Sequence, residues 1–456
     1  MKKLILSALF LSATSMAFAQ QNVSTVDQSG NDQNANVEQH GLKNDTDIDQ
    51  TYDTNGADVY QWGTKNDANI NQYGIGNEAG IEQVGTKNVA TQLQGLFTLF
   101  GGFYNSAMAT QYGNLNTSLQ EQEGDANTAE VFQNGTSNDA TQYQISPWFS
   151  SGNYANIYQD GKNNSGEQYQ NGEGNAAYIT QFGNSNDAYS EQYGEYNFAN
   201  QWQNGKRNEA EIYQGDEYNT ATQSQSGNDN MAVAFQNDFT STGGYNYAEQ
   251  TQSGNRNYAE IDQGLGSYDE GNSAVQFQTG NDNVAYVDQE GYANSSTQSQ
   301  DGNRNISETY QNGSGNVSNT DQMGNDNGTY TDQDGDLNVS GFAQDGKDNL
   351  GFVFQNGTGN VSLSSQTGKG NIAIIDQNGV LNVSGTIQNG TNNGISIDQD
   401  GWLNVSGAIQ DGKNNLGIIT QNGLGNLSLF SQFGNGHSNT VNQIGNGNVS
   451  TVNQNN

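Results

Sequence analysis

Residues 338–381 read NVSGFAQDGKD, NLGFVFQNGTG, NVSLSSQTGKG and NIAIIDQNGVL, four successive segments of 11 residues. Each segment starts with Asn, has a small residue at position 3, and carries Gln at position 7 and Gly at position 9. Seven residues from Asn to Gln suit one β-strand of roughly 20 Å. Gly accepts the positive φ of a tight turn. The segment therefore predicts short strands, each followed by a four-residue turn after its Gln.

The same repeat, Asn-x-small-x-x-x-Gln-x-Gly-x-x, recurs along the whole chain. Gln stands at 11-residue intervals from Gln28 to Gln94, Gln111 to Gln144, Gln159 to Gln236, Gln252 to Gln263 and Gln278 to Gln454, which makes 38 repeats. The place of the first Asn is taken by another residue in two repeats, at Gln33 and His437. A fixed period over this length is typical of a solenoid.

Two observations set the number of strands per turn. In a strand, positions 1, 3, 5 and 7 share one face, which is Asn66, Ala68, Ile70 and Gln72 in one repeat. We interpret this regular face as inward, with Asn and Gln stacked on their own kind in ladders. From Ser296 onward, position 3 is Ser in every second repeat. The sequence therefore predicts an all-β fold: a two-sheet, amyloid-like β-solenoid (parallel β-helix) with two strands per 22-residue turn and about 19 turns.

Four insertions interrupt the repeats. With repeats numbered from Asn22, they follow repeats 7, 11, 19 and 21, at residues 95–104, 145–152, 237–245 and 264–271. All four numbers are odd, so a two-strand turn places all four insertions on the same edge. Clustered aromatic groups often mark contact surfaces. We expect a lateral-contact surface there, formed by Phe97, Phe100, Phe103, Trp148 and Phe149.

Residues 1–19 have the pattern of a secretory signal peptide. Two Lys residues precede the apolar stretch Leu4–Ala13, and Ala17–Ala19 is a small-x-small cleavage site. The stretch is too short to span a bilayer, so we expect no transmembrane anchor. The mature chain is then a single secreted solenoid over residues 20–456, located outside the cell.

Composition narrows the function classes. The chain has no Cys and one Pro, and proline cannot donate to a β ladder. Without Lys2 and Lys3, 11 basic residues face 49 acidic ones, a net charge of about −38. Nucleic acid is therefore not an expected partner, because phosphate binding needs a basic face.

Catalytic and metal-binding patterns are weak. Two histidines, His40 and His437, lie far apart, so we expect no enzyme activity and no cofactor. The run of three alternating Asp residues at 332–336 resembles a calcium loop. However, Leu337 and Ala343 stand where an EF-hand needs Gly and Glu. Whether acidic turns bind calcium stays open at this stage.

The repeat resembles the curlin repeat, Ser/Asn-x-Ala-x-x-x-Gln-x-Gly-x-x-Asn, over nearly the whole chain after residue 20. The resemblance implies a secreted subunit that polymerises with itself into extracellular curli-like fibres for biofilm matrix and cell adhesion. It also implies a nucleator subunit and export through a curli-type outer-membrane pore. The chain departs from that pattern in its four insertions, its larger number of turns and its lack of a Gly-rich segment after the signal peptide.

Self-assembly would use the terminal repeats, because unpaired strand edges template further pairing. The predicted ladder residues at the ends are Asn22, Gln28, Gln39, Gln443, Asn448 and Gln454. Two alternatives remain: a monomeric solenoid that serves as an adhesin stalk, and a surface or ice binder. Ice binders need flat outward ranks of Thr, whereas the outward positions here are irregular. No separate binding domain supports a stalk.

Overall fold

The computed structural model describes residues 21–95, 102–236, 243–264 and 270–455. Over these residues the chain forms 39 β-strands and no helix, and no helix long and apolar enough to cross a membrane is found among them. Two compact units divide at Arg207 and Asn208. We call residues 21–207 the N-terminal unit and residues 208–455 the C-terminal unit, and describe each by itself.

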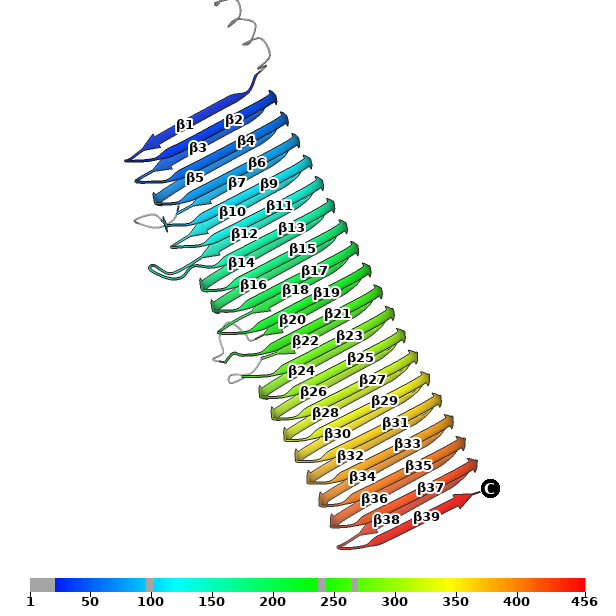
Figure 1. Cartoon of the computed structure of the whole chain (residues 1–456). Helices are drawn as coiled ribbons and strands as arrows, with labels where there is room; N and C mark the ends of the chain where they lie inside the picture. Colours follow the sequence, from blue (N-terminus) through cyan, green and yellow to red (C-terminus); the bar gives the residue numbers. More distant parts are fainter. Residues whose placement is uncertain (1–20, 96–101, 237–242, 265–269, 456) are drawn as a thin grey trace, which may run out of the picture. The chain divides into compact units, whose positions relative to one another are not determined.

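The N-terminal unit consists of two parallel sheets (Figure 1). Its first sheet contains β1 (Val23–Ser29), β3 (Asp45–Thr51), β5 (Asp67–Ile75), β7 (Val89–Gln94), β10 (Thr117–Glu123), β12 (Asp139–Ile145), β14 (Ser165–Glu173) and β16 (Asp187–Glu195). Its second sheet contains β2 (Asn34–Leu42), β4 (Gly56–Thr64), β6 (Glu78–Thr86), β9 (Ser106–Asn114), β11 (Thr128–Thr136), β13 (Tyr154–Lys162), β15 (Ala176–Asn184) and β17 (Phe198–Lys206). The two-residue strand β8 (Gly102–Phe103) pairs with the end of β5.

The C-terminal unit repeats this arrangement. Its first sheet contains β18 (Glu209–Gln214), β20 (Met231–Gln236), β22 (Tyr258–Gln263), β24 (Val284–Tyr292), β26 (Ile306–Ser314), β28 (Gly328–Asp336), β30 (Leu350–Thr358), β32 (Ile372–Val380), β34 (Gly394–Trp402), β36 (Leu416–Leu424) and β38 (Ser438–Ile444). Its second sheet contains β19 (Thr220–Asn228), β21 (Tyr247–Asn255), β23 (Ser273–Asn281), β25 (Ser295–Asn303), β27 (Val317–Asn325), β29 (Val339–Lys347), β31 (Val361–Lys369), β33 (Val383–Thr391), β35 (Val405–Lys413), β37 (Leu427–Asn435) and β39 (Val449–Asn455).

The register confirms two strands per turn. Each strand pairs in parallel with the strand two repeats later, so that Ile48 lies beside Ile70 and Ser340 beside Ser362, 22 residues apart. The N-terminal unit has eight such turns and the C-terminal unit eleven, which gives the 19 turns expected. The chain is thus an all-β, two-sheet parallel β-solenoid.

The predicted turn after Gln is wrong in detail. Most strands run from position 2 through position 10 of the repeat, so β31 continues past Gln366 and includes Gly368. A Cβ built on Gly346 would lie 2.0 Å from the carbonyl oxygen of Gly368 in the next turn, and φ there is 129°. Glycine is therefore needed inside the strand, where stacked backbones approach closely. The true turn is position 11, which adopts a positive φ of 60° at Lys65 and 57° at Leu337.

The inward face is the predicted one. The side chains at positions 1, 3, 5 and 7 are buried, and the largest fully buried apolar groups are isoleucines at position 5, such as Ile70 and Ile375. Position 5 also carries buried Gln in blocks. In the N-terminal unit this Gln block lies in the first sheet (Gln142 beside Gln168), and in the C-terminal unit it lies in the second (Gln250 beside Gln276). The second-sheet block begins at Gln201 in β17, the last strand of the N-terminal unit.

Candidate functional site

The Gln at position 7 holds successive turns together and also joins the two sheets. Gln377 Nε2 donates a 2.8 Å hydrogen bond to Gln399 Oε1 in the next turn. The same nitrogen donates at 3.0 Å to the carbonyl of Val361 on the opposite sheet. Both side chains are buried. A buried amide left without partners costs about 1–3 kcal/mol, so each Gln depends on the turns beside it.

The Asn at position 1 forms the side-chain ladder that the sequence predicts in many turns, as where Asn404 Nδ2 donates to Asn382 Oδ1 at 3.2 Å. It also bonds main-chain groups. Asn382 donates its backbone N–H to Asn360 Oδ1 at 3.1 Å, and its Nδ2 donates to the carbonyl of Gly401 at 2.9 Å. Asn therefore satisfies main-chain groups at the corner, next to the close glycine contact. This requirement explains why Asn recurs with Gly in almost every repeat.

Within the described residues, the Gln ladders end differently at the two edges: the Oε1 atoms lack a donor at one edge, and the Nε2 atoms lack a Gln acceptor at the other. Gln28 Nε2 donates to Gln50 at 2.7 Å and Gln39 Nε2 to Gln61 at 2.9 Å, and no donor reaches their own Oε1 atoms within the described residues. At the other edge, Gln454 accepts from Gln432 at 2.7 Å. The Nε2 of Gln454 donates to no other Gln within the described chain. One edge thus offers acceptors and the other offers donors.

All six predicted assembly residues lie on these edge strands or directly beside them. Asn22 Oδ1 accepts the backbone N–H of Asn44 at 3.0 Å, and Asn448 N–H donates to Asn426 at 3.0 Å. Gln443 accepts from Gln421 at 2.8 Å. Their roles in assembly stay predictions.

A model of the curlin associated repeat matches the chain four times, each over about three repeats. The matches cover residues 151–183, 161–194, 346–379 and 412–445. The chain is a curlin-repeat protein. A search of curated proteins finds no match. The repeat and the β-solenoid are those of a structural protein, and no three acidic or histidine side chains within the described segments are grouped to hold a metal ion.

The insertions of the curlin-repeat protein follow strands of the first sheet in both units, as predicted: β7 and β12, then β20 and β22. Phe97 and Phe100 fall outside the described residues. Phe103 does not lie in a protruding loop, because it belongs to β8 and is stacked on Ile75. Trp148 is 49% exposed and Phe149 is 93% exposed. Of the predicted lateral-contact residues, these two project into solvent.

A charge pattern that the sequence reasoning missed runs along the other set of turns. All eleven Lys and Arg residues after residue 20 stand at position 10 or 11 of even-numbered repeats, where the chain passes from the second sheet back to the first. They are Lys43, Lys65, Lys87, Lys162, Lys206, Arg207, Arg256, Arg304, Lys347, Lys369 and Lys413. The signal was readable as a 22-residue spacing of basic residues. We call these positions the even turns, and the corresponding positions of odd-numbered repeats the odd turns.

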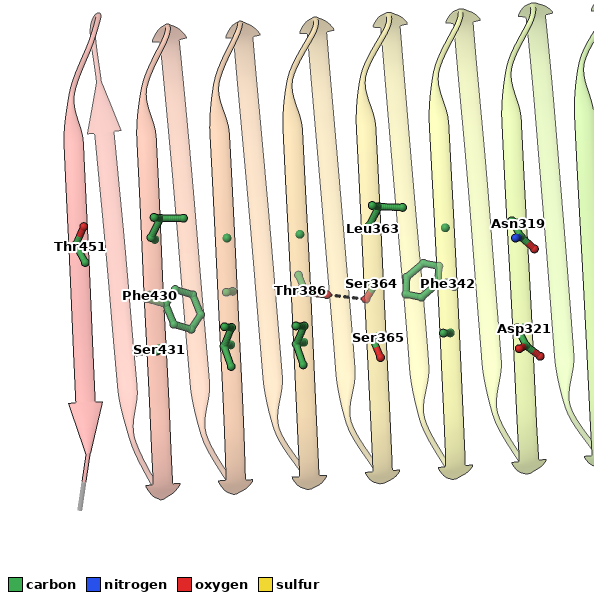
Figure 2. A pocket seen from close by; sticks show the side chains of 18 of the residues that line it. Asn319, Asp321, Phe342, Leu363, Ser364, Ser365, Thr386, Phe430, Ser431 and Thr451 are labelled. Carbon is green, nitrogen blue, oxygen red and sulfur yellow. Dashed lines mark hydrogen bonds between the residues drawn. The ribbon is translucent and has the colours of Figure 1, made fainter.

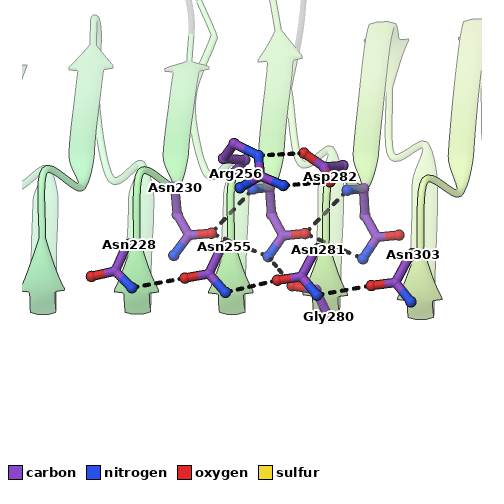
Figure 3. Close-up of polar contacts among 10 residues, drawn as sticks. Asn228, Asn230, Asn255, Arg256, Gly280, Asn281, Asp282 and Asn303 are labelled. Atoms are coloured by element: carbon purple, nitrogen blue, oxygen red, sulfur yellow. Dashed lines mark hydrogen bonds and ion pairs between the residues drawn. The ribbon is translucent and has the colours of Figure 1, made fainter.

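In the C-terminal unit the even turns neutralise themselves (Figure 3). Arg256 Nε and Nη2 donate to Asp282 at 2.6 and 2.8 Å, and Arg304 pairs with Asp326 in the same way. The Arg256 guanidinium holds the pKa of Asp282 below its usual value. A row of Asn side chains runs beside these pairs, with Asn255 Nδ2 donating to the next Asn at 2.7 Å.

The outer faces of the sheets carry stacked aromatic rings. One row in the second sheet of the N-terminal unit consists of Tyr112, Phe132, Tyr158, Phe182 and Trp202, with ring centroids 4.9 to 6.5 Å apart. Several Tyr hydroxyls donate to neighbouring carboxylates. Burial and the bond to Glu130 raise the pKa of Tyr154 to about 12, so this phenol stays protonated at neutral pH. These rows stabilise the faces through ring stacking.

A shallow apolar groove crosses the outer face of the second sheet in the C-terminal unit (Figure 2). Glycines at position 4, such as Gly385 and Gly407, leave it open, and Leu363 and Leu429 project beside it.

Proposed function

We propose that this curlin-repeat protein is a secreted structural subunit that assembles end to end into extracellular, amyloid-like fibres. The observation that carries the proposal is the direction of the Gln ladder. The β1–β2 edge presents Oε1 acceptors, and the β38–β39 edge presents Nε2 donors. Two copies placed head to tail would complete both ladders and pair two exposed strand edges.

The winding sets the register of such a junction. Strands alternate between the sheets and β39 belongs to the second sheet, so the next strand position lies over β38. An incoming copy would therefore place β1 on β38 and β2 on β39. In this register Gln28 meets Gln443 and Gln39 meets Gln454. Position 5 is Val in all four of these strands: Val26, Val37, Val441 and Val452. The junction would then have matched side chains at its centre.

Charge favours head-to-tail contact over contact between like ends. The sequence from Asn22 to Lys65 contains eight acidic and two basic residues. Residues 415–456 contain no Asp, Glu, Lys or Arg. Two N-terminal edges would repel each other, whereas an uncharged C-terminal edge accepts an acidic strand without like-charge contact.

The remaining elements of this role are proposals that rest on the curlin repeat. They are secretion after removal of residues 1–19, export through a curli-type outer-membrane pore, interaction with a nucleator subunit, and a place in biofilm matrix and cell adhesion. The acidic surface and the filled interior suit a structural role without catalysis, cofactor or nucleic acid.

Comparison of end and interior variants in seeded fibre growth tests the proposal. We expect Gln28→Ala and Gln454→Ala to slow elongation more than Gln289→Ala does. The interior residue, by contrast, should lose more stability, because Gln289 is buried with bonds on both sides (2.8 Å from Gln263, 2.7 Å to Gln311). Equal elongation rates in all three variants, or a purified mature chain that stays monomeric, would contradict end-to-end assembly.

A further inference from the structure

The two sets of turns in the N-terminal unit carry opposite charges. Its even turns hold six basic residues and no acidic one: Lys43, Lys65, Lys87, Lys162, Lys206 and Arg207. Its odd turns hold five acidic residues and no basic one: Asp32, Asp53, Asp125, Glu173 and Glu195. The N-terminal unit therefore has one basic row and one acidic row along its two sets of turns. Asp125 is buried, so Asp32, Asp53, Glu173 and Glu195 form the accessible part of the acidic row.

Both rows are held rigidly at the spacing of the solenoid. Along the basic row, Lys65 N–H donates to the Leu42 carbonyl and Lys87 N–H to the Thr64 carbonyl, both at 2.9 Å. Along the acidic row, Gly76 N–H donates to the Asp53 carbonyl at 3.1 Å. Successive charges on either row are therefore about 4.8 Å apart wherever consecutive turns carry them.

The backbone does not explain why lysines stand in this row. Lys43, Lys65 and Lys87 have φ of 60°, 60° and 58°, a conformation that Gly and Asn adopt more readily. Other turns of the same unit place Gly or a variety of side chains at this position with the same positive φ, as at Gly76, Thr54 and Leu115. Because this position accepts many side chains, the recurrence of lysine in consecutive even turns points to a role for its side chain.

Four lysines of the basic row have no carboxylate partner in an ion pair. Over the described part of the chain, no carboxylate lies within 4.0 Å of the ammonium of Lys43, Lys65, Lys87 or Lys162. In the C-terminal unit the equivalent turns alternate Arg and Asp and pair with each other, as Arg304 does with Asp326 at 2.6 Å. The positive charge of these four lysines is therefore available to a partner.

We propose that N-terminal units of neighbouring copies pack side by side, with the basic row of one copy against the acidic row of the next. A second copy fits better than another polyanion, because its acidic row has the same rise per turn as the basic row. Several opposed pairs can then form in register along parallel solenoids. Each exposed pair contributes little alone, so the contact depends on their number and weakens with salt.

The proposal rests on self-association of the chain, but it concerns fibre width rather than length. Because the odd turns also carry the insertion with Phe149, 93% exposed, the same contact would cover this ring. Negative-stain microscopy and small-angle scattering report width, and seeded dye-binding kinetics report elongation. If no fibres form at all, sedimentation of the soluble mature chain still reports lateral association.

Charge reversal and rescue form the main experiment. In Lys43→Glu/Lys65→Glu/Lys87→Glu we expect bundle width at low salt to fall about two-fold or more, with elongation unchanged within about two-fold. Adding Asp32→Lys/Asp53→Lys to that variant reverses the acidic row in the same two turns as positions 43 and 65, so that opposite charges face each other there again, and should restore part of the width. Failure of the rescue, with both variants folded by circular dichroism, would overturn the proposal.

A matched control separates row position from net charge. Lys43→Gln/Lys65→Gln/Lys87→Gln lowers the net charge by three, and so does Asn171→Asp/Asn200→Asp/Asn204→Asp on the outer sheet faces. We expect only the first variant to thin the bundles. Equal thinning in both would show that general repulsion sets the width. Loss of heparin binding in the Lys variant with unchanged width would assign the row to a polyanion instead.

Discussion

The same row of turns is built in two ways in the two units. In the C-terminal unit Arg304, with φ of 55°, pairs with Asp326 one turn on. In the N-terminal unit Lys65, with φ of 60°, has Lys43 and Lys87 at the same position in the adjacent turns. Because the backbone is the same in both places, the fold does not dictate these charges. The inward side chains determine the solenoid fold, so the charges of the turns can vary and can serve contacts with other molecules.

The largest expected effect tests whether the interiors of the two units are built in the same way. A Cβ on Gly161 would lie 1.9 Å from the Gly183 carbonyl oxygen, and one on Gly346 would lie 2.0 Å from that of Gly368. We expect Gly161→Ala and Gly346→Ala each to cost about 3 kcal/mol or more in free energy of unfolding, measured by urea denaturation. A large loss in one unit alone would break the comparison.

Removal of a ladder amide should have the next largest effect, again equal in the two units. Gln50 donates to Gln72 at 2.7 Å, and Gln355 donates to Gln377 at 2.8 Å. Replacement of either acceptor by Ala leaves a buried N–H without its partner. We expect Gln72→Ala and Gln377→Ala to lose about 2 kcal/mol each in urea unfolding. Losses no larger than that of an exposed substitution would show that the ladders are not structural.

Acidic residues on the outer faces give a smaller, pH-dependent effect. Burial, followed by the charges of Asp45 and Asp47, raises the pKa of Asp67 above 3.8, and burial and acidic neighbours raise that of Asp376. The folded state then binds protons more readily than the unfolded state. Stability should therefore increase as the pH falls from neutral towards 3.8. When the urea midpoint is measured against pH, Asp67→Asn and Asp376→Asn should make its pH dependence weaker. An unchanged pH dependence would show that these two carboxyl groups do not cause it.

The smallest expected effect concerns the basic residues of the even turns, which, among the described residues, form ion pairs in the C-terminal unit but not at Lys65 in the N-terminal unit. Arg304→Gln should lower the urea midpoint slightly at low salt and not at high salt, because an exposed ion pair is screened. Lys65→Gln should leave the midpoint unchanged. Arg304 lowers the pKa of Asp326, so the benefit is present above pH 3.8 and is lost as the pH falls below it. Equal effects of both substitutions would show that Lys65 has a partner within its own chain.

The sequence was sufficient for the parts of the fold that depend on period. The 22-residue spacing of Ser at position 3 predicted the stacking of Ser340 on Ser362, and the inward positions followed from strand alternation. The position of the turn near Gly346 could not be predicted from the sequence, because Gly suits both a turn and a close backbone contact inside a strand. Only the carbonyl of the next turn distinguishes them.

The candidate site was predicted less completely. Asn and Gln both bond side chain to side chain as expected. The additional bonds of Asn382 to main-chain groups depend on the corner geometry and were not predicted. Phe103 was assigned to a loop because its return to the ladder in β8 leaves no mark in the repeat. The basic row could have been predicted from the sequence alone, since Lys43, Lys65 and Lys87 are 22 residues apart, which is one turn.

Intermolecular disulfide formation tests the central claim, head-to-tail assembly, most directly. In the proposed register Thr25 of β1 lies beside Thr440 of β38 in the adjacent copy, at about 4.8 Å, which is within disulfide range. The chain has no Cys, so Thr25→Cys/Thr440→Cys gives a clean background. We predict a ladder of covalent multimers when fibres of this variant are oxidised. Fibres that form but give no multimers, or that cross-link only in Thr25→Cys/Thr451→Cys, would contradict the account.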